Sequence, residues 1–248
     1  MYNAFAEVYD RLQDADYAKF ADYYEHIFEK YGIKPELVLD LACGTGNITV
    51  PMSQRGYDMI GVDLSVEMLN IAREKAQTAG QNILFLNQDM TEFELYGTVD
   101  AILCALDGVN YLTADGETDE LFRLAENYLN PGGLMIFDIN TEYKLREVLG
   151  SNTFVNEEQG IYYVWRNDFS EETRICSFEL NFFRETEDGT YERFDEYQEE
   201  RAYSADELIQ SATAAGLVAE GVFSPFTFEN AKEKEEEERI FIVLSKKK

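Results

Sequence analysis

A turn of small residues follows the first buried strand that the sequence predicts. Residues 38–47 read VLDLACGTGN, so an apolar strand runs into a turn containing Gly44 and Gly46, with a helix expected directly afterwards. Such a turn lets a ligand approach the backbone and meet the unpaired N–H groups of a helix start. A Gly-x-Gly alone is a weak signal, but its strand–turn–helix context indicates a ligand site.

Two acidic residues end the next two predicted strands. Asp63 follows an apolar strand, 17 residues past Gly46, and Asp89 closes the strand after that. An acid at the first position can accept hydrogen bonds from ribose hydroxyls, and Asp89 could reach an adenine amino group. Each acid alone is an ordinary cap or loop residue, but the three landmarks in order predict a nucleoside-containing ligand.

A nicotinamide dinucleotide is the first candidate for such a ligand. The fingerprint G-x-G-x-x-G needs a third glycine at position 49, where this chain has Thr49. Asp40, just before the turn, suits a ligand that carries an ammonium group better than one that carries phosphates. Both differences disfavour a dehydrogenase.

The elements that position these residues alternate between short apolar strands and helices. Strands are expected at residues 37–41, 59–62, 83–86, 101–105 and 134–138, and helices at 48–55, 66–79 and 118–129, with a turn at 130–133. Near-continuous apolar strands separated by helices indicate a parallel sheet covered on both faces. The aromatic spacing before Gly32 indicates an amphipathic helix that ends there.

After about Gly150 the hydrophobic period changes from 3.6 to 2. An antiparallel meander is expected at residues 161–169, 174–186 and 191–203, with an Asp188-Gly189 hairpin turn. A helix should resume after Ser204, which with Glu207 forms a capping box. Two strands, at 217–223 and 239–245, close the chain.

Together these motifs resemble those of class I S-adenosylmethionine-dependent methyltransferases. Residues 40–46, DLACGTG, resemble their first motif, and the landmarks Asp63, Asp89, the strand 100–106 and the segment 129–134 follow in order. The match covers roughly residues 36–140. It implies a doubly wound, seven-stranded Rossmann-like α/β sheet with an antiparallel last strand, and S-adenosylmethionine as the cofactor.

The N-terminal pattern narrows the resemblance. Phe5-Ala-x-x-Tyr9-Asp10-x-Leu12 and Tyr17-x-x-Phe20 resemble a bacterial subgroup of small methyltransferases, some uncharacterised, that is similar to amino-sugar N-methyltransferases. That subgroup inserts an antiparallel sheet after the fifth strand. The implied organisation is an N-terminal helical lid (1–32), a cofactor-binding α/β domain (33–150 and 204–248) and an inserted β subdomain (151–203).

The resemblance also implies roles for matching residues. Ala42 and Gly44 would lie by the methionine part, Asp63 would hold the ribose, and Leu106 would lie near the sulfonium. Asp40, which suits an ammonium group, is a further expected cofactor contact. Further expected cofactor contacts come from the lid and from the adenosine side: Tyr2, Tyr9, Tyr17, Leu64, Met68, Asp89 and Met90. Ala42 stands where many relatives have glycine.

Methyl transfer depends more on alignment and exclusion of water than on a strong acid or base. Tyr111 matches a position where amino-sugar relatives place a possible base, although a tyrosine there is more often a pocket wall. Asp107 could orient a cationic amine. His26, the only histidine, is expected at the surface of the N-terminal helix.

Composition limits the partners. The 248 residues carry a net charge of −28, which disfavours nucleic acid and anionic membranes, and the adenine-methyltransferase pattern Asn/Asp-Pro-Pro-Tyr is absent. One histidine and three scattered cysteines argue against a zinc site and for reduced thiols in a cytoplasmic protein. No membrane span or signal sequence is expected.

The insertion is both aromatic and acidic. Residues 151–203 hold 12 of the 34 aromatic residues, with 14 acids against five Arg and no Lys. Most of these side chains should simply pack or be solvated, but the sheet could roof the acceptor pocket, or form a homodimer face. A roof would favour a neutral or cationic small-molecule acceptor.

The predicted function is transfer of a methyl group to N or O of that small molecule. Two alternatives stay open at this stage. An RNA- or protein-directed methyltransferase would show clustered Lys and Arg on the open edge of the sheet, and a non-catalytic S-adenosylmethionine-binding protein would have a blocked acceptor pocket.

Overall fold

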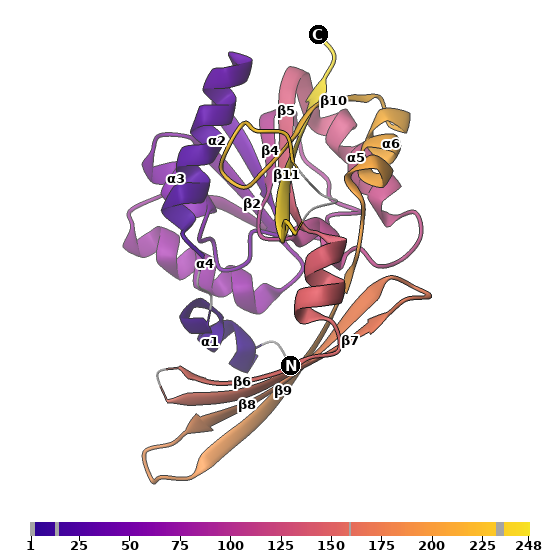
Figure 1. Ribbon diagram of the computed structural model, residues 1–248. Helices are drawn as coiled ribbons and strands as arrows, with labels where there is room; N and C mark the ends of the chain where they lie inside the picture. Colours follow the sequence, from indigo (N-terminus) through magenta and orange to yellow (C-terminus); the bar gives the residue numbers. More distant parts are fainter. Residues whose placement is uncertain (1–2, 13–14, 159, 232–235) are drawn as a thin grey trace.

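A computed structural model describes residues 3–12, 15–158, 160–231 and 236–248 (Figure 1). Its main sheet has seven strands in the order β10-β11-β5-β4-β1-β2-β3. Their bounds are β1 (Leu37–Leu41), β2 (Asp58–Asp63), β3 (Leu84–Asn87), β4 (Val99–Cys104), β5 (Leu129–Asn140), β10 (Leu217–Phe223) and β11 (Arg239–Lys246). Strand β11 is antiparallel to both of its neighbours, and the other described pairings in this sheet are parallel. The predicted doubly wound sheet with a reversed last strand is confirmed.

Helices cover both faces of this sheet. On one face α2 (Tyr17–Tyr31) and α3 (Thr49–Gln54) share a core with the strands, and α4 (Val66–Thr78) packs beside α3. On the other face lie α5 (Glu117–Tyr128) and α6 (Ala205–Ala214). Helix α2 ends at Gly32, as expected, because this residue adopts a left-handed conformation with φ 66°.

The insertion forms a second, four-stranded antiparallel sheet. It comprises β6 (Thr153–Glu158), β7 (Ile161–Ser170), β8 (Ile175–Glu185) and β9 (Tyr191–Arg201). Helix α1 (Asn3–Leu12) lies between this sheet and α4 (Figure 1), where Phe5 and Val8 share a buried cluster with Met68 and Phe182. The second sheet therefore faces the carboxyl ends of the main strands across α1.

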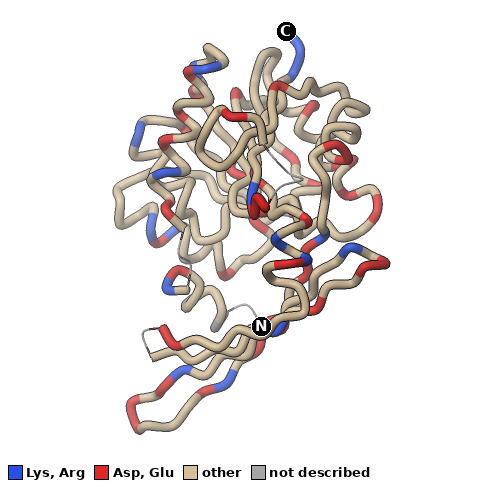
Figure 2. The backbone as a smooth tube through the Cα atoms, viewed as in Figure 1, with Lys and Arg blue, Asp and Glu red and all other residues tan. Residues whose placement is uncertain are grey.

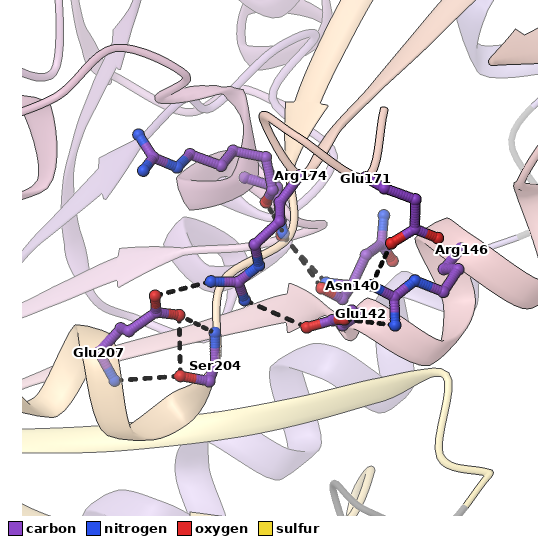
Figure 3. A network of polar contacts seen from close by, with 9 residues as sticks. Asn140, Glu142, Arg146, Glu171, Arg174, Ser204 and Glu207 are labelled. Atoms are coloured by element: carbon purple, nitrogen blue, oxygen red, sulfur yellow. Dashed lines mark hydrogen bonds and ion pairs between the residues drawn. The ribbon is translucent and has the colours of Figure 1, made fainter. Parts of the chain in front are cut away.

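An ionic network fixes the base of the second sheet to the α/β body (Figure 3). Arg174, in the β7–β8 turn, contacts Glu207 of α6 at 2.7 Å and Glu142 at 3.2 Å. Arg146, in the helical segment η2 (Lys144–Leu149), contacts Glu142 and Glu171, each at 2.7 Å. Glu207 also completes the predicted capping box with the N-cap of α6. These contacts hold the second sheet in a defined position over the main sheet.

The structure differs from the predicted elements in two places. Strand β6 was not expected, and it pairs with β7 from Thr153↔Arg166 to Glu158↔Ile161. Strand β5 begins at Leu129, before the predicted turn at 130–133, and these four residues form a bulge because the register moves from Val99↔Leu129 to Ala101↔Leu134. Pro131 cannot donate to a ladder, which explains the bulge. Other boundaries move by one to a few residues.

Acidic residues are spread over both the α/β body and the second sheet (Figure 2). The three cysteines are buried and free of disulfides. Within the described ranges, no helix is long and apolar enough to cross a membrane.

Candidate active site

One cavity of about 850 Å³ lies between the carboxyl ends of the main strands, α1 and the second sheet. Every predicted site residue that the structure describes lines it, whereas Tyr2 lies outside the described residues. The predicted residues in the cavity are Tyr9, Tyr17, Asp40, Ala42, Gly44, Asp63, Leu64, Met68, Asp89, Met90, Leu106, Asp107 and Tyr111. Their contacts with a cofactor or acceptor stay predictions. His26 is exposed and does not line the cavity.

The turn after β1 is held open by backbone conformation and by Asp63. Ala42, Gly44 and Gly46 have φ values of 53°, 53° and 77°. The left-handed conformation of Ala42 is strained for a residue with a side chain. The Asp63 carboxylate accepts the Gly44 N–H at 2.8 Å and the Ser65 N–H at 2.8 Å, so it connects the ends of β1 and β2. Burial raises the pKa of Asp63 despite these two hydrogen bonds.

Asp40 is more deeply buried than Asp89. Asp40 is buried and accepts a hydrogen bond from the Thr49 hydroxyl at 2.5 Å. Burial raises its pKa to about 7, so an ammonium group beside it would favour the carboxylate. Asp89 is half-buried and accepts from the Thr91 N–H at 2.7 Å, which makes it the cap of a turn as well as a cavity residue.

An acid in α1 connects this helix to the same turn. The Asp10 carboxylate accepts from Thr45 Oγ1 at 2.6 Å and Asn47 Nδ2 at 2.8 Å, and pairs with Lys75 Nζ at 2.6 Å. Burial alone would raise the pKa of Asp10, but hydrogen bonds from Lys75, Thr45 and Asn47 hold it below its ordinary value. These contacts join α1, whose Tyr9 lines the cavity, to the turn after β1.

Asp10→Ala is expected to loosen α1 and to speed cofactor release by roughly three- to tenfold, the effect of losing about 1 kcal/mol from a half-exposed pair. Stopped-flow measurement of cofactor dissociation and amide exchange over residues 3–12 would both report this change. Asp10→Asn keeps an oxygen for Thr45 but removes the charge facing Lys75, so it should fall between wild type and alanine. Equal dissociation rates in all three proteins would contradict this expectation.

The opposite wall begins with two strained residues after β4. Leu106 and Asp107 have φ values of 55° and 57°. Their N–H groups donate to the buried Asp138 carboxylate at 2.9 and 3.1 Å, which holds the strained turn. Arg239 pairs with Asp138 and, at 2.6 Å, with Asp107. The Asp107 carboxylate, predicted to orient a cationic amine, is therefore already paired with a cation.

Asn110 and Tyr111, which follow this turn in the chain, connect it to the second sheet. Asn110, in the short 3₁₀ helix η1 (Gly108–Tyr111), donates to the carbonyls of Asn140 and Arg201 at 3.1 and 3.0 Å. Tyr111 is 42% exposed, and its hydroxyl lies 3.2 Å from Oε1 of Gln198. The Tyr111 hydroxyl therefore lies where η1 meets strand β9 of the second sheet.

The sequence did not reveal several further cavity residues: Asn140, Lys144, Gln198, Glu199, Glu200 and Arg239. Asn140 and its neighbour Asp138 lie at the carboxyl end of β5. Asp63 was identified because it ends a predicted strand, and the same criterion applied to the strand predicted at 134–138 would have pointed to this part of the chain. Glu200 and Arg239 come from the second sheet and the last strand, and no local pattern marks them. Among the described residues there is no group of three or more His, Cys, Asp or Glu that could hold a metal ion.

The sheet order, the glycine turn and the acid at the end of β2 define a Rossmann-like nucleoside-binding enzyme of the methyltransferase type. A family model described as a methyltransferase domain matches residues 38–133. YqeM of Bacillus subtilis (strain 168), named as a methyltransferase, is 32% identical over 250 residues, covering 100% of this chain and 98% of that protein.

Solved structures agree with this class. An S-adenosylmethionine-dependent methyltransferase from Clostridium acetobutylicum ATCC 824 is 33% identical, with a TM-score of 0.90 and coverage of 100% of this chain and 99% of that chain. The sugar N-methyltransferase KedS8 from Streptoalloteichus sp ATCC 53650 shares the fold at 20% identity, with a TM-score of 0.78 and coverage of 100% and 93%. The chain belongs to the S-adenosylmethionine-dependent methyltransferases, and S-adenosylmethionine is its cofactor.

Proposed function

We propose that this enzyme transfers a methyl group from S-adenosylmethionine to N or O of a small molecule that is neutral or cationic. The observation that carries the proposal is that one continuous cavity joins the predicted cofactor residues to the loop after β4 and to the second sheet. At about 850 Å³ it lies near the top of the size range of small-molecule pockets, about 300–1,000 Å³, which supports room for a cofactor and a small acceptor together.

The charges around the cavity support the proposed acceptor class. Its lining includes Asp107, Glu117, Glu199 and Glu200, whereas Lys144 and Arg239 are the cations among its described lining residues. Arg239 is already paired with two carboxylates. A phosphate or a polyanionic RNA would meet a net negative wall, which disfavours the nucleic-acid alternative. The name of KedS8, a sugar N-methyltransferase of the same fold, fits a small acceptor.

The residues of this chain would act mainly by position. When bound, S-adenosylmethionine supplies a methyl group on a positively charged sulfur. The Asp63 carboxylate and the N–H groups of the turn after β1 would orient the cofactor, and α1 and the second sheet would exclude water. The aromatic side chains Tyr163, Trp165 and Phe178 form an apolar wall on the acceptor side, suited to an amine as well as to a neutral ring.

Calorimetry tests the cofactor half of this proposal. S-adenosylmethionine and its demethylated product, S-adenosylhomocysteine, should bind, and NAD should bind at least about 100-fold more weakly because the third glycine of the dinucleotide fingerprint is missing. Methyl-labelled cofactor incubated with a metabolite extract should then label a small molecule. Equal affinity for NAD, or label found only in RNA or protein, would contradict the proposal.

A homodimer and a cytoplasmic location stay predictions. Tyr162 and Tyr191 of the second sheet are exposed and do not line the cavity, so they would be available to a dimer through this sheet. Sedimentation velocity of the full chain would decide the oligomeric state.

A further inference from the structure

One buried carboxyl of the second sheet faces the acceptor end of the cavity. Glu200 of β9 lines the cavity, yet only 4% of its surface is exposed. Its Oε2 accepts a hydrogen bond from Asn140 Nδ2 at 2.7 Å. The amide oxygen of the same Asn140 side chain faces two cations, since Oδ1 accepts from Lys144 Nζ at 2.8 Å and Arg239 Nη2 at 3.2 Å. Asn140 therefore separates Glu200 from both positive charges.

Asp107 and Glu200 both line this end of the cavity, but they differ in whether a cation is paired with them. Asp107 forms an ion pair with Arg239 at 2.6 Å, and Arg239 also pairs with Asp138. Within the described part of the chain no ion pair includes Glu200, whose direct polar partner is the neutral amide of Asn140. A cation that entered the cavity would find Asp107 already paired with Arg239 and the Glu200 carboxyl without an ion-pair partner among the described residues.

The surroundings of Glu200 favour its neutral form in the absence of a ligand, mainly because the carboxyl is buried. Burial raises its pKa to about 8, and Asp107 adds to this effect. Asn140, Lys144 and Arg239 lower the pKa, but by less than burial raises it. On the neighbouring strand β8, Cys176 is paired with Glu200 in register, and its pKa is itself raised, to about 12, so it adds no charge at neutral pH. A carboxyl in these surroundings gains most from a bound cation.

We propose that Glu200 is a catalytic residue that binds an amine acceptor and accepts its proton. This inference rests on the proposed methyltransferase function and makes its acceptor an amine. The carboxyl is placed at the cavity wall, buried, hydrogen-bonded on one oxygen and not paired with a cation, as such a role requires.

The proton balance favours an amine over an alcohol. The amine enters as an ammonium ion, whose charge favours the Glu200 carboxylate, so that the carboxyl proton leaves to solvent. One N–H proton of the ammonium ion then passes to an Oε atom of the Glu200 carboxylate, leaving a neutral amine with a free lone pair. That nitrogen forms a bond to the methyl carbon while the carbon–sulfur bond breaks, and the electron pair of the broken bond stays on sulfur. The N-methylammonium product then carries the positive charge that the sulfonium has lost.

The raised pKa of Glu200 lies close to the pKa of the ammonium group that it would deprotonate. An ordinary glutamate, with a pKa of about 4.3, would be a poor base for ammonium groups with pKa values of about 8–10. Burial brings Glu200 close to that range, near the operating pH where general bases are most effective. The same carboxylate is far too weak to deprotonate an alcohol.

A probe cation tests this proposal before the natural acceptor is known. In protein carrying ¹³C-labelled glutamate and saturated with S-adenosylhomocysteine, the Glu200 carboxyl signal is the one lost in Glu200→Gln. Its titration midpoint, expected near pH 8, should fall by at least about one pH unit in saturating methylammonium, because a cation favours the carboxylate. Methanol, and potassium chloride at matched ionic strength, should leave it unchanged. An unchanged midpoint in methylammonium would overturn the proposal.

Glu196 provides a matched control. It is buried on the same strand, four residues before Glu200, but it does not line the cavity. Its carboxyl signal should therefore not respond to methylammonium. Calorimetry with S-adenosylhomocysteine on the same samples separates the two proposals. Loss of this binding would count against the proposed function, whereas binding without a response of Glu200 would count against the present inference alone.

Methyl transfer to a metabolite extract gives a second readout. The labelled product should be retained by a cation exchanger, and Glu200→Gln should reduce its formation by about 100-fold, a typical loss for a general base, with cofactor affinity unchanged. Glu196→Gln should stay within about twofold of wild type. A product that the exchanger does not retain, or equal transfer by folded Glu200→Gln protein, would overturn the proposal.

Discussion

Replacing Asp63 by alanine should weaken binding of S-adenosylmethionine by about 10–100-fold. Both carboxylate oxygens already organise the site, because they accept the N–H groups of Gly44 and Ser65 at 2.8 Å each. The carboxylate also lines the cavity at the end of β2, where the ribose hydroxyls are predicted to lie. Losing hydrogen bonds to a charged group costs about 1–3 kcal/mol, and each 1.4 kcal/mol is tenfold in affinity. Isothermal calorimetry would measure the change.

A second aspartate on the same strand is the natural comparison. Asp58 begins β2 at its other end, is exposed and lies outside the cavity lining, so Asp58→Ala should leave the affinity within about twofold. Asp63→Asn should give an intermediate affinity, since its amide oxygen can replace one of the two acceptors. If folded Asp63→Ala protein binds the cofactor as tightly as wild type, Asp63 is not the ribose ligand.

The main sheet could be predicted from the sequence because its central strands are buried on both faces. In β1, β4 and β5 apolar runs are nearly continuous, and this pattern depends only on local composition. Strand β6 could not be found in this way. Its residues Thr153–Glu158 are all exposed and show no alternation, and the strand forms by backbone pairing to one edge of the second sheet. Burial leaves a pattern in sequence, and edge pairing leaves almost none.

The two halves of the cavity differ in the same way, because one half could be predicted from local sequence and the other could not. The predicted cofactor side uses residues at or just after the ends of consecutive strands, so Asp40, Gly44, Asp63 and Asp89 could be located by counting along the chain. The acceptor side brings together residues that are far apart in sequence. Asp107 meets Arg239 across 132 positions, and Asn140 meets Glu200 across 60. Such contacts depend on how the second sheet sits on the main sheet, which no local motif specifies.

The contact of Asp107 with Arg239 is one of these long-range contacts. From sequence, Asp107 was a candidate to orient a cationic amine, and this role stays a prediction. The structure places the Arg239 guanidinium between Asp107 and Asp138. On the proposal that Glu200 binds the amine, Asp107 would be a wall residue of the cavity that is held by Arg239.

Arg239→Gln should lower the free energy of unfolding by about 3–5 kcal/mol, because it leaves buried carboxylates without their cation. The Asp138 side chain is fully buried, and it holds the strained turn at Leu106 and Asp107 through two N–H groups. Urea unfolding at neutral pH would measure the loss. The control is Arg166→Gln, which removes an exposed pair with Glu179 at 3.4 Å and should change stability by less than about 0.5 kcal/mol.

The pH dependence of this loss identifies its cause. Burial raises the pKa of Asp138, and Arg239 is the main influence that opposes the rise. Without Arg239 the pKa rises further, so the folded variant binds a proton at Asp138 more tightly than the unfolded chain does. A raised folded-state pKa stabilises the protein at low pH, and this stabilisation is lost as pH rises through it. The deficit of Arg239→Gln should therefore shrink on acidification, and Asp138→Asn in the same protein should recover part of it at neutral pH. A deficit that is constant with pH, with no recovery in the double variant, would mean that Arg239 stabilises the protein by packing and not by its charge.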